Sequence, residues 1–170
     1  MSTGATLATI SAQAGSEGLA ALVLLSPNFG VKNKAAAVLS WPWGVQMATL
    51  ITGSARHSWV PESEVRRLNW TTSYSLGVAA QMQAVVDMAQ GLELGDLTLP
   101  VLTVVAEVDK VVDLDAARET HERMGSPAKK FVVLPGSKRH ELAGFAIDET
   151  TVGPLANIIA GFVNETVVTE

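Results

Sequence analysis

Three short, mainly apolar runs recur along the chain, at residues 19–25, 101–106 and 131–134. Each run is followed by a stretch containing Gly, Pro, Asn, Asp or Ser, the residues that most often end regular structure. An unbroken apolar run of this length is typical of a strand that is covered on both faces, as in a parallel sheet. The pattern therefore predicts three buried strands.

Around these runs the pattern becomes helical. Residues 5–14 contain no helix breaker before Gly15, and 114–124 form a charged amphipathic segment that ends at Gly125. Two more helices are predicted, at about 76–91 and after Pro154, because their apolar residues recur at helical spacing. The apolar faces consist of Met82, Val85, Val86 and Ala89 in the first, and of Leu155, Ile158, Ile159, Phe162 and Val163 in the second.

The segment at about 31–95 differs from the rest of the chain. It contains all four tryptophans, and Pro and Gly residues interrupt its helical stretches. We interpret it as an inserted helical region, a cap or lid, whose tryptophans either pack within the insertion or contact a ligand. The remaining elements alternate between strand and helix, which predicts an α/β fold in which parallel strands are flanked by helices. We expect one domain over 1–170 that includes this insertion.

Composition narrows the function classes. The net charge is −5 and basic residues do not cluster, which argues against a nucleic-acid partner. The absence of cysteine excludes disulfides and thiolate chemistry, and it fits a reducing compartment, so we expect a cytoplasmic location. No apolar run reaches the ~20 residues that a transmembrane helix needs. No metal or cofactor is expected, because Asp109, Asp113 and Asp115 lack the glycine and distal glutamate of a calcium loop.

Candidate catalytic residues follow the predicted strands. Loops at the carboxyl ends of parallel strands meet at one sheet edge, and here they carry Asn28 with Phe29, then Asp109, then His140. Near the N-terminus, Ser2-Thr3-Gly4 matches the end of G-x-S-x-G, the turn that presents a nucleophilic serine. The order Ser, Asp, His is the chain order of the α/β-hydrolase triad.

Each of these residues also has a simpler interpretation. Ser2 and Thr3 are suitable helix caps, Asp109 is a suitable turn residue, and His140 follows two basic residues as surface histidines often do. Asp113 and Asp115 are better placed than Asp109 to cap the next helix. His57 and His121 are not near strand ends, and we interpret them as structural or solvated.

Taken together, several segments resemble the C-terminal part of an α/β-hydrolase of the lysophospholipase and monoacylglycerol-lipase-like group, which includes serine aminopeptidase-like domains. The matching segments are Ser2-Thr3-Gly4-Ala5-Thr6-Leu7-Ala8, Leu24-Leu25-Ser26-Pro27-Asn28-Phe29, Pro100-Val101-Leu102 through Asp109-Lys110-Val111-Val112, and His140 with Ala143-Gly144 behind it. The resemblance implies a serine hydrolase of carboxylic esters, with a small ester or lipid-like substrate.

The resemblance also implies roles for individual residues. Ser2 would be the nucleophile, His140 the general base and Asp109 the carboxylate that orients the histidine. The backbone N–H of Thr3 would be one oxyanion-hole donor. We expect Asn28 and Phe29 to contact substrate.

One departure from the family pattern stands out. Family members carry further strands and a glycine-rich oxyanion loop before the serine turn, whereas this sequence begins at that turn. We therefore expect a partial fold, a fragment without the N-terminal half of the sheet. The alternatives are an inactive fragment, a binding protein derived from a hydrolase, or the same fold acting on thioester, peptide or carbon–carbon bonds.

Overall fold

The structure is a computed structural model that describes residues 1–142, 144 and 149–167. Ala143, one of the residues that carry the family resemblance, lies outside this part of the chain. The chain divides into two compact units, Met1–Lys32 with Val86–Glu170, and Asn33–Val85. We call them the sheet unit and the insertion unit and describe each by itself.

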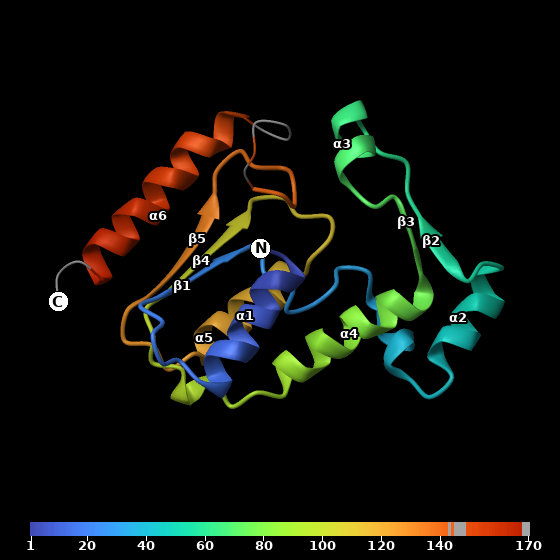
Figure 1. The fold of residues 1–170 in the computed structure, drawn as a ribbon, viewed down its shortest axis with the longest axis horizontal. Helices are drawn as coiled ribbons and strands as arrows, with labels where there is room; N and C mark the ends of the chain where they lie inside the picture. Colours follow the sequence, from blue (N-terminus) through green and yellow to red (C-terminus); the bar gives the residue numbers. More distant parts are fainter. Residues whose placement is uncertain (143, 145–148, 168–170) are drawn as a thin grey trace. The chain divides into compact units, whose positions relative to one another are not determined.

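The sheet unit contains three parallel strands in the order β1, β4, β5 (Figure 1). They span Leu22–Leu25, Val101–Ala106 and Lys129–Leu134. All six residues of the central strand β4 are buried, as its mainly apolar sequence predicts. The predicted first strand is too long at its start, because Leu19 is 43% exposed and β1 begins only at Leu22.

Helices cover both faces of this sheet. Helix α6 (Val152–Thr166) lies on one face, and α1 (Thr3–Ala14) and α5 (Leu114–Arg123) lie on the other (Figure 1). Two apolar clusters fill the layers. The first contains Ala5, Ala12, Leu22, Leu24, Phe29, Ala89, Leu94, Leu97, Val101 and Met124, and the second Leu102, Val104, Ala106, Leu134, Leu142, Leu155 and Phe162. The predicted parallel sheet flanked by helices is therefore confirmed.

Short elements complete the sheet unit. The 3-10 turns Leu94–Asp96 and Glu149–Thr151 precede β4 and α6, respectively. Among the described residues, no helix is both long and apolar enough to cross a membrane.

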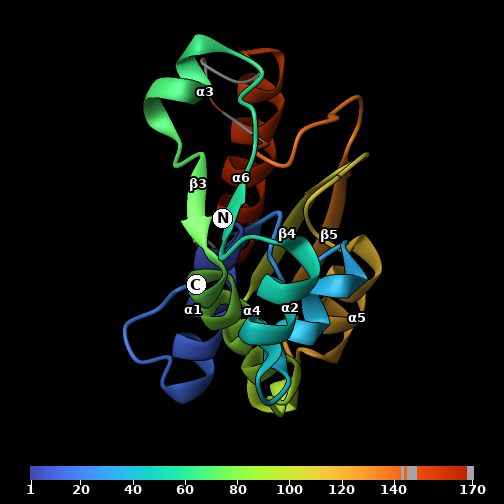
Figure 2. The ribbon, with the colours of Figure 1, turned by 90° about the vertical axis from the view of Figure 1, so that its right-hand side faces the viewer.

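The insertion unit combines short helices with a small sheet (Figure 2). Its elements are a 3-10 helix at Lys34–Ser40, α2 (Gly44–Thr52), β2 (Arg56–Ser58), α3 (Glu64–Asn69), β3 (Ser73–Ser75) and the first part of α4 (Leu76–Gln90). The sequence predicts α4 correctly but not the antiparallel pair β2 and β3. Polar and ring contacts join these two strands, such as the hydrogen bond from Arg56 Nε to Ser73 Oγ at 3.0 Å. The strands do not show the alternating apolar pattern by which a half-buried strand is recognised in a sequence.

Candidate active site

Ser2 lies at a sharp turn where α1 begins. Its backbone has φ 53° and ψ −135°, a conformation that non-glycine residues rarely adopt. The turn is bonded to the sheet, because the N–H of Ser2 donates to the carbonyl of Leu25 at the end of β1, at 3.0 Å. Strained backbone of this kind persists only where the surroundings fix it, and it often occurs at functional sites.

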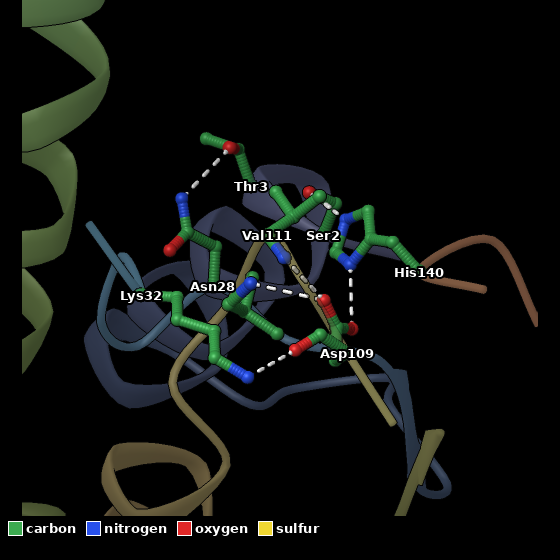
Figure 3. A network of polar contacts seen from close by, with 8 residues as sticks. Ser2, Thr3, Asn28, Lys32, Asp109, Val111 and His140 are labelled. Carbon is green, nitrogen blue, oxygen red and sulfur yellow. Dashed lines mark hydrogen bonds and ion pairs between the residues drawn. The ribbon is translucent and has the colours of Figure 1, made fainter. Parts of the chain in front are cut away.

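His140 connects Ser2 to Asp109 (Figure 3). The Nε2 atom of His140 is 2.9 Å from Ser2 Oγ, and its Nδ1 atom is 2.8 Å from Asp109 Oδ2. The serine comes from the turn before α1, the aspartate from the loop after β4 and the histidine from the loop after β5. The three residues that the sequence singles out are thus brought within hydrogen-bond distance of one another.

The second carboxylate oxygen of Asp109 is bound by its own loop. Asp109 Oδ1 accepts the backbone N–H groups of Val111 and Val112, at 2.7 and 3.0 Å. The aspartate has no exposed surface. Burial by itself raises the pKa of Asp109, but the hydrogen bonds with His140 and the two backbone groups outweigh it, so its pKa lies below the usual value. The carboxylate therefore stays charged beside the imidazole.

Two further side chains tie the loops of the site together. Lys32 Nζ donates to the backbone carbonyl of Asp109 at 2.7 Å, and Glu107 Oε2 accepts the N–H of Gly136 at 2.8 Å. The second bond links the loop that carries the aspartate to the loop that carries the histidine. Sequence analysis missed both residues, since a lone lysine or glutamate has no motif or spacing that marks it.

Thr3 and Asn28 lie beside the serine turn. Thr3 is the first residue of α1, where N–H groups have no acceptor within the helix and favour negative charge. Asn28 is only 4% exposed, and its Nδ2 atom lies 3.4 Å from Thr3 Oγ1. A direct contact between Asn28 and substrate stays a prediction.

Phe29 has a different place from the one expected. Its side chain has no exposed surface and belongs to the first apolar cluster of the sheet unit. Phe29 therefore packs in the core of the sheet unit, and its contact with substrate stays a prediction. The sequence does not distinguish the two roles, because an aromatic residue after a strand end suits either.

The remaining polar candidates are structural or exposed. His57 is exposed on β2, whereas His121 is 4% exposed and its Nδ1 atom is 2.9 Å from Thr103 Oγ1. Burial, together with the nearby positive charges of Lys129 and Arg118, lowers the pKa of His121 to about 4.

Asp113 caps α5, as the sequence suggests, by accepting the N–H of Asp115 at 3.0 Å. Within the described part of the chain, no three His, Asp or Glu side chains are grouped so that they could hold a metal ion.

Comparison with known proteins identifies the family. A family model described as serine aminopeptidase, S33, matches residues 1–144. The chain belongs to this family. The match confirms the resemblance to a group that includes serine aminopeptidase-like domains. No curated protein sequence matches this member of the S33 family significantly.

Solved structures agree with this assignment at the level of the fold. A monoacylglycerol lipase from Paleococcus ferrophilus has a TM-score of 0.70 and 16% identity, and the match covers 97% of this chain and 66% of that one. A soluble variant of monoglyceride lipase from Saccharomyces cerevisiae, in complex with a substrate analogue, has a TM-score of 0.68 and 12% identity, with 97% and 63% covered. The S33 chain thus spans about two thirds of the length of these structures.

Proposed function

We propose that the protein is a serine hydrolase of carboxylic esters that acts through an acyl-enzyme. The observation that supports this best is the continuous hydrogen-bonded path from Ser2 Oγ through the imidazole of His140 to Asp109, with distances of 2.9 and 2.8 Å. A serine hydroxyl is a weak nucleophile until a positioned base removes its proton, and this path supplies that base. The family membership of the chain supports the same reading.

The proposed reaction has two halves. Ser2 Oγ attacks the ester carbonyl carbon while His140 Nε2 takes the hydroxyl proton, and the resulting imidazolium faces the carboxylate of Asp109. The tetrahedral intermediate collapses, the C–O bond to the alcohol breaks, and His140 gives its proton to the departing alcohol. Water then attacks the acyl group with His140 as base, which releases the carboxylic acid and restores Ser2.

The oxyanion of each tetrahedral intermediate needs hydrogen-bond donors. We propose the N–H of Thr3 as one of them, because it is the first N–H of α1 and directly follows the nucleophile. The positive end of the α1 dipole adds to this stabilisation. A single donor of this kind is worth roughly 3 kcal/mol in the transition state.

Lipid-like esters are the substrates we favour. The solved structures with a similar fold include two monoacylglycerol or monoglyceride lipases, although identities of 16% and 12% relate the folds alone. The insertion expected at about 31–95 overlaps the compact unit Asn33–Val85, whose surface carries several large apolar side chains. We propose that this unit acts as the cap that selects an apolar acyl or alcohol group.

Hydrolysis of p-nitrophenyl esters of increasing acyl length, compared with aminoacyl p-nitroanilides, tests this proposal. We expect kcat/KM to favour the esters, with Ser2→Ala inactive and Ser11→Ala, an exposed serine on the same helix, unchanged. Preferred cleavage of the anilides would instead support a peptidase. No turnover of either class by the folded chain would support the non-catalytic alternative.

A further inference from the structure

The loop after β1, residues 26–32, contacts both the nucleophile turn and the aspartate loop. We call it the β1 exit loop. It leaves the sheet at Ser26, which has no exposed surface, a φ of 40° and an N–H that donates to Val104 of β4 at 2.8 Å. A buried, non-glycine residue in this conformation redirects the chain at a cost that the surrounding contacts must offset.

Asn28 binds the nucleophile turn through three groups. Its N–H donates to the carbonyl of Ser2 at 3.3 Å, its carbonyl accepts the hydroxyl of Thr6 at 2.7 Å, and its Nδ2 lies 3.4 Å from Thr3 Oγ1. Both Asn28 and Thr6 are buried, at 4% and 0% exposed. Bonds shielded from water hold their geometry better than exposed ones. The first turn of α1 is thus fixed at the serine itself and at the proposed oxyanion donor (Figure 3).

Lys32 binds the aspartate loop at the other end of the exit loop. Its Nζ donates to the carbonyl of Asp109 at 2.7 Å, and its N–H donates to the carbonyl of Val111 at 3.0 Å. An ammonium donor makes the first of these a charge-assisted bond, which is stronger than a neutral one. Val111 also donates its N–H to Asp109 Oδ1. Lys32 therefore binds the same turn that orients the carboxylate.

The backbone between these two anchors reinforces the contact. Val31 forms an antiparallel bridge with Val112, and the carbonyl of Gly30 accepts the N–H of Asp113 at 2.7 Å. A Cβ atom at Gly30 would lie 2.8 Å from that of Ala116, closer than real Cβ contacts, so the close approach needs glycine here.

We propose that Asn28 and Lys32 are positioning residues. Through them, the β1 exit loop keeps Ser2 and Asp109 within hydrogen-bond distance of His140. The inference rests on the proposed hydrolase function and assigns roles that the catalytic triad itself does not include. Neither residue takes part in proton transfer. The Asn28 side chain acts on Thr3, the residue next to Ser2, and the Lys32 side chain acts on the Asp109 loop, so the two side chains support opposite ends of the same hydrogen-bonded path.

Small displacements of a catalytic group are enough to lower the reaction rate, which is why contacts that position it affect catalysis. A misplacement of about 1 Å in a catalytic group can cost roughly 100-fold in rate. Loss of one of several anchors shifts a loop by less, so we expect Asn28→Ala and Lys32→Met each to lower kcat by about 10-fold while KM changes little. Lys32→Arg keeps the cationic donor and should stay within about threefold of the wild type.

The test compares the two variants with matched controls, Asn157→Ala and Lys130→Met, which alter exposed residues of the same types on α6 and β5. The first readout is the rate at which a fluorophosphonate labels Ser2, measured with kcat and KM for a p-nitrophenyl ester. The second is the proton NMR resonance of the His140 Nδ1–H, which reports the bond to Asp109. Circular dichroism melts confirm that each variant is folded at the assay temperature.

The two anchors should give different signatures. Lys32→Met should slow labelling and shift or broaden the His140 resonance, whereas Asn28→Ala should slow labelling and leave that resonance in place. Should Asn28→Ala not fold, Thr3→Val removes the same hydrogen bond from its other partner and keeps the backbone N–H, so this variant should also slow labelling of Ser2.

The outcomes separate this inference from the proposed function. A folded wild-type chain that is not labelled at Ser2 would contradict the proposed function itself. If the wild type is labelled but both variants react at its rate, the positioning roles are wrong. Equal losses in the control variants, or a fall in kcat that Lys32→Arg does not rescue, would likewise overturn them.

Discussion

The two units of the chain differ in how far their apolar side chains are buried. In the sheet unit, β4 is buried along its whole length and two apolar clusters fill the space between sheet and helices. In the insertion unit, large apolar side chains stay exposed, among them Leu50 at 86% and Val60 at 89%. Where such side chains form a contiguous patch, they often mark an interaction site.

Under the proposed function, the catalytic residues lie in one unit and the cap that selects substrate is the other. All the residues of the hydrogen-bonded path belong to the sheet unit, where loops emerge from a packed sheet and are bonded to one another. Precise geometry needs such support. We therefore expect substitutions in the sheet unit to change the reaction rate or the stability strongly, and substitutions on the insertion surface to change substrate preference alone.

The largest effect should come from Asp109→Asn. An amide in place of the carboxylate accepts the Nδ1–H of His140 poorly and no longer stabilises the imidazolium, so we expect kcat to fall by about 10⁴-fold. The measurement is the rate of ester hydrolysis at neutral pH, with circular dichroism to confirm the fold. A loss of less than about tenfold would mean that Asp109 does not act on His140 in the reaction.

The next effect concerns the core beneath the site. Phe29→Ala should lower the free energy of unfolding by about 3–5 kcal/mol, because it opens a cavity in a cluster that also contains Leu24 and Val101. Urea denaturation of the chain measures this loss. A near-zero change in the free energy of unfolding, together with an altered substrate preference, would show that Phe29 contacts substrate, as the sequence suggests.

A smaller effect depends on pH. His121 has a pKa of about 4 in the folded chain against 6.5 ordinarily, so the folded state binds fewer protons than the unfolded state between these values. Stability should fall as the pH drops from 6.5 to 4, by up to ~3 kcal/mol at ~1.4 kcal/mol per pKa unit. Urea midpoints at pH 7 and 4.5, compared with those of His121→Gln, isolate this contribution. Parallel pH dependences in the two proteins would show that His121 does not cause it.

The smallest effect on stability should come from the insertion surface. Leu50→Ser removes an 86% exposed side chain, so we expect the free energy of unfolding to change by less than ~0.5 kcal/mol. The ratio of kcat/KM for long-chain to short-chain esters should fall, because the apolar surface shrinks. A loss of stability above ~1 kcal/mol with an unchanged ratio would show that Leu50 serves packing and not selection.

The sheet unit could be predicted well because its signals are local and physical. A mainly apolar run predicts both ends of β4, and Gly125 marks the end of the segment that contains α5. The same reasoning missed β2 and β3 in the insertion unit. These strands are joined by contacts such as that of Arg56 with Ser73, which no hydrophobic periodicity in the sequence predicts.

The candidate site shows the same limit at the scale of single residues. The partial G-x-S-x-G motif selects Ser2, and strand ends select Asp109 and His140, because sheet topology brings the carboxyl ends of parallel strands to one edge. The bond from Lys32 to Asp109 depends on a tertiary approach of two loops, and nothing near Lys32 in sequence signals it. The burial of Phe29 is another feature that local sequence does not predict, because it does not say which way a loop side chain faces.

The central claim is that Ser2 is an activated nucleophile. Incubation of the folded chain with a fluorophosphonate, followed by intact mass and peptide mapping, tests it most directly. We expect a single adduct, located on Ser2 and lost in both Ser2→Ala and His140→Ala. An adduct on any other residue, or no adduct on a chain that circular dichroism shows to be folded, would contradict it.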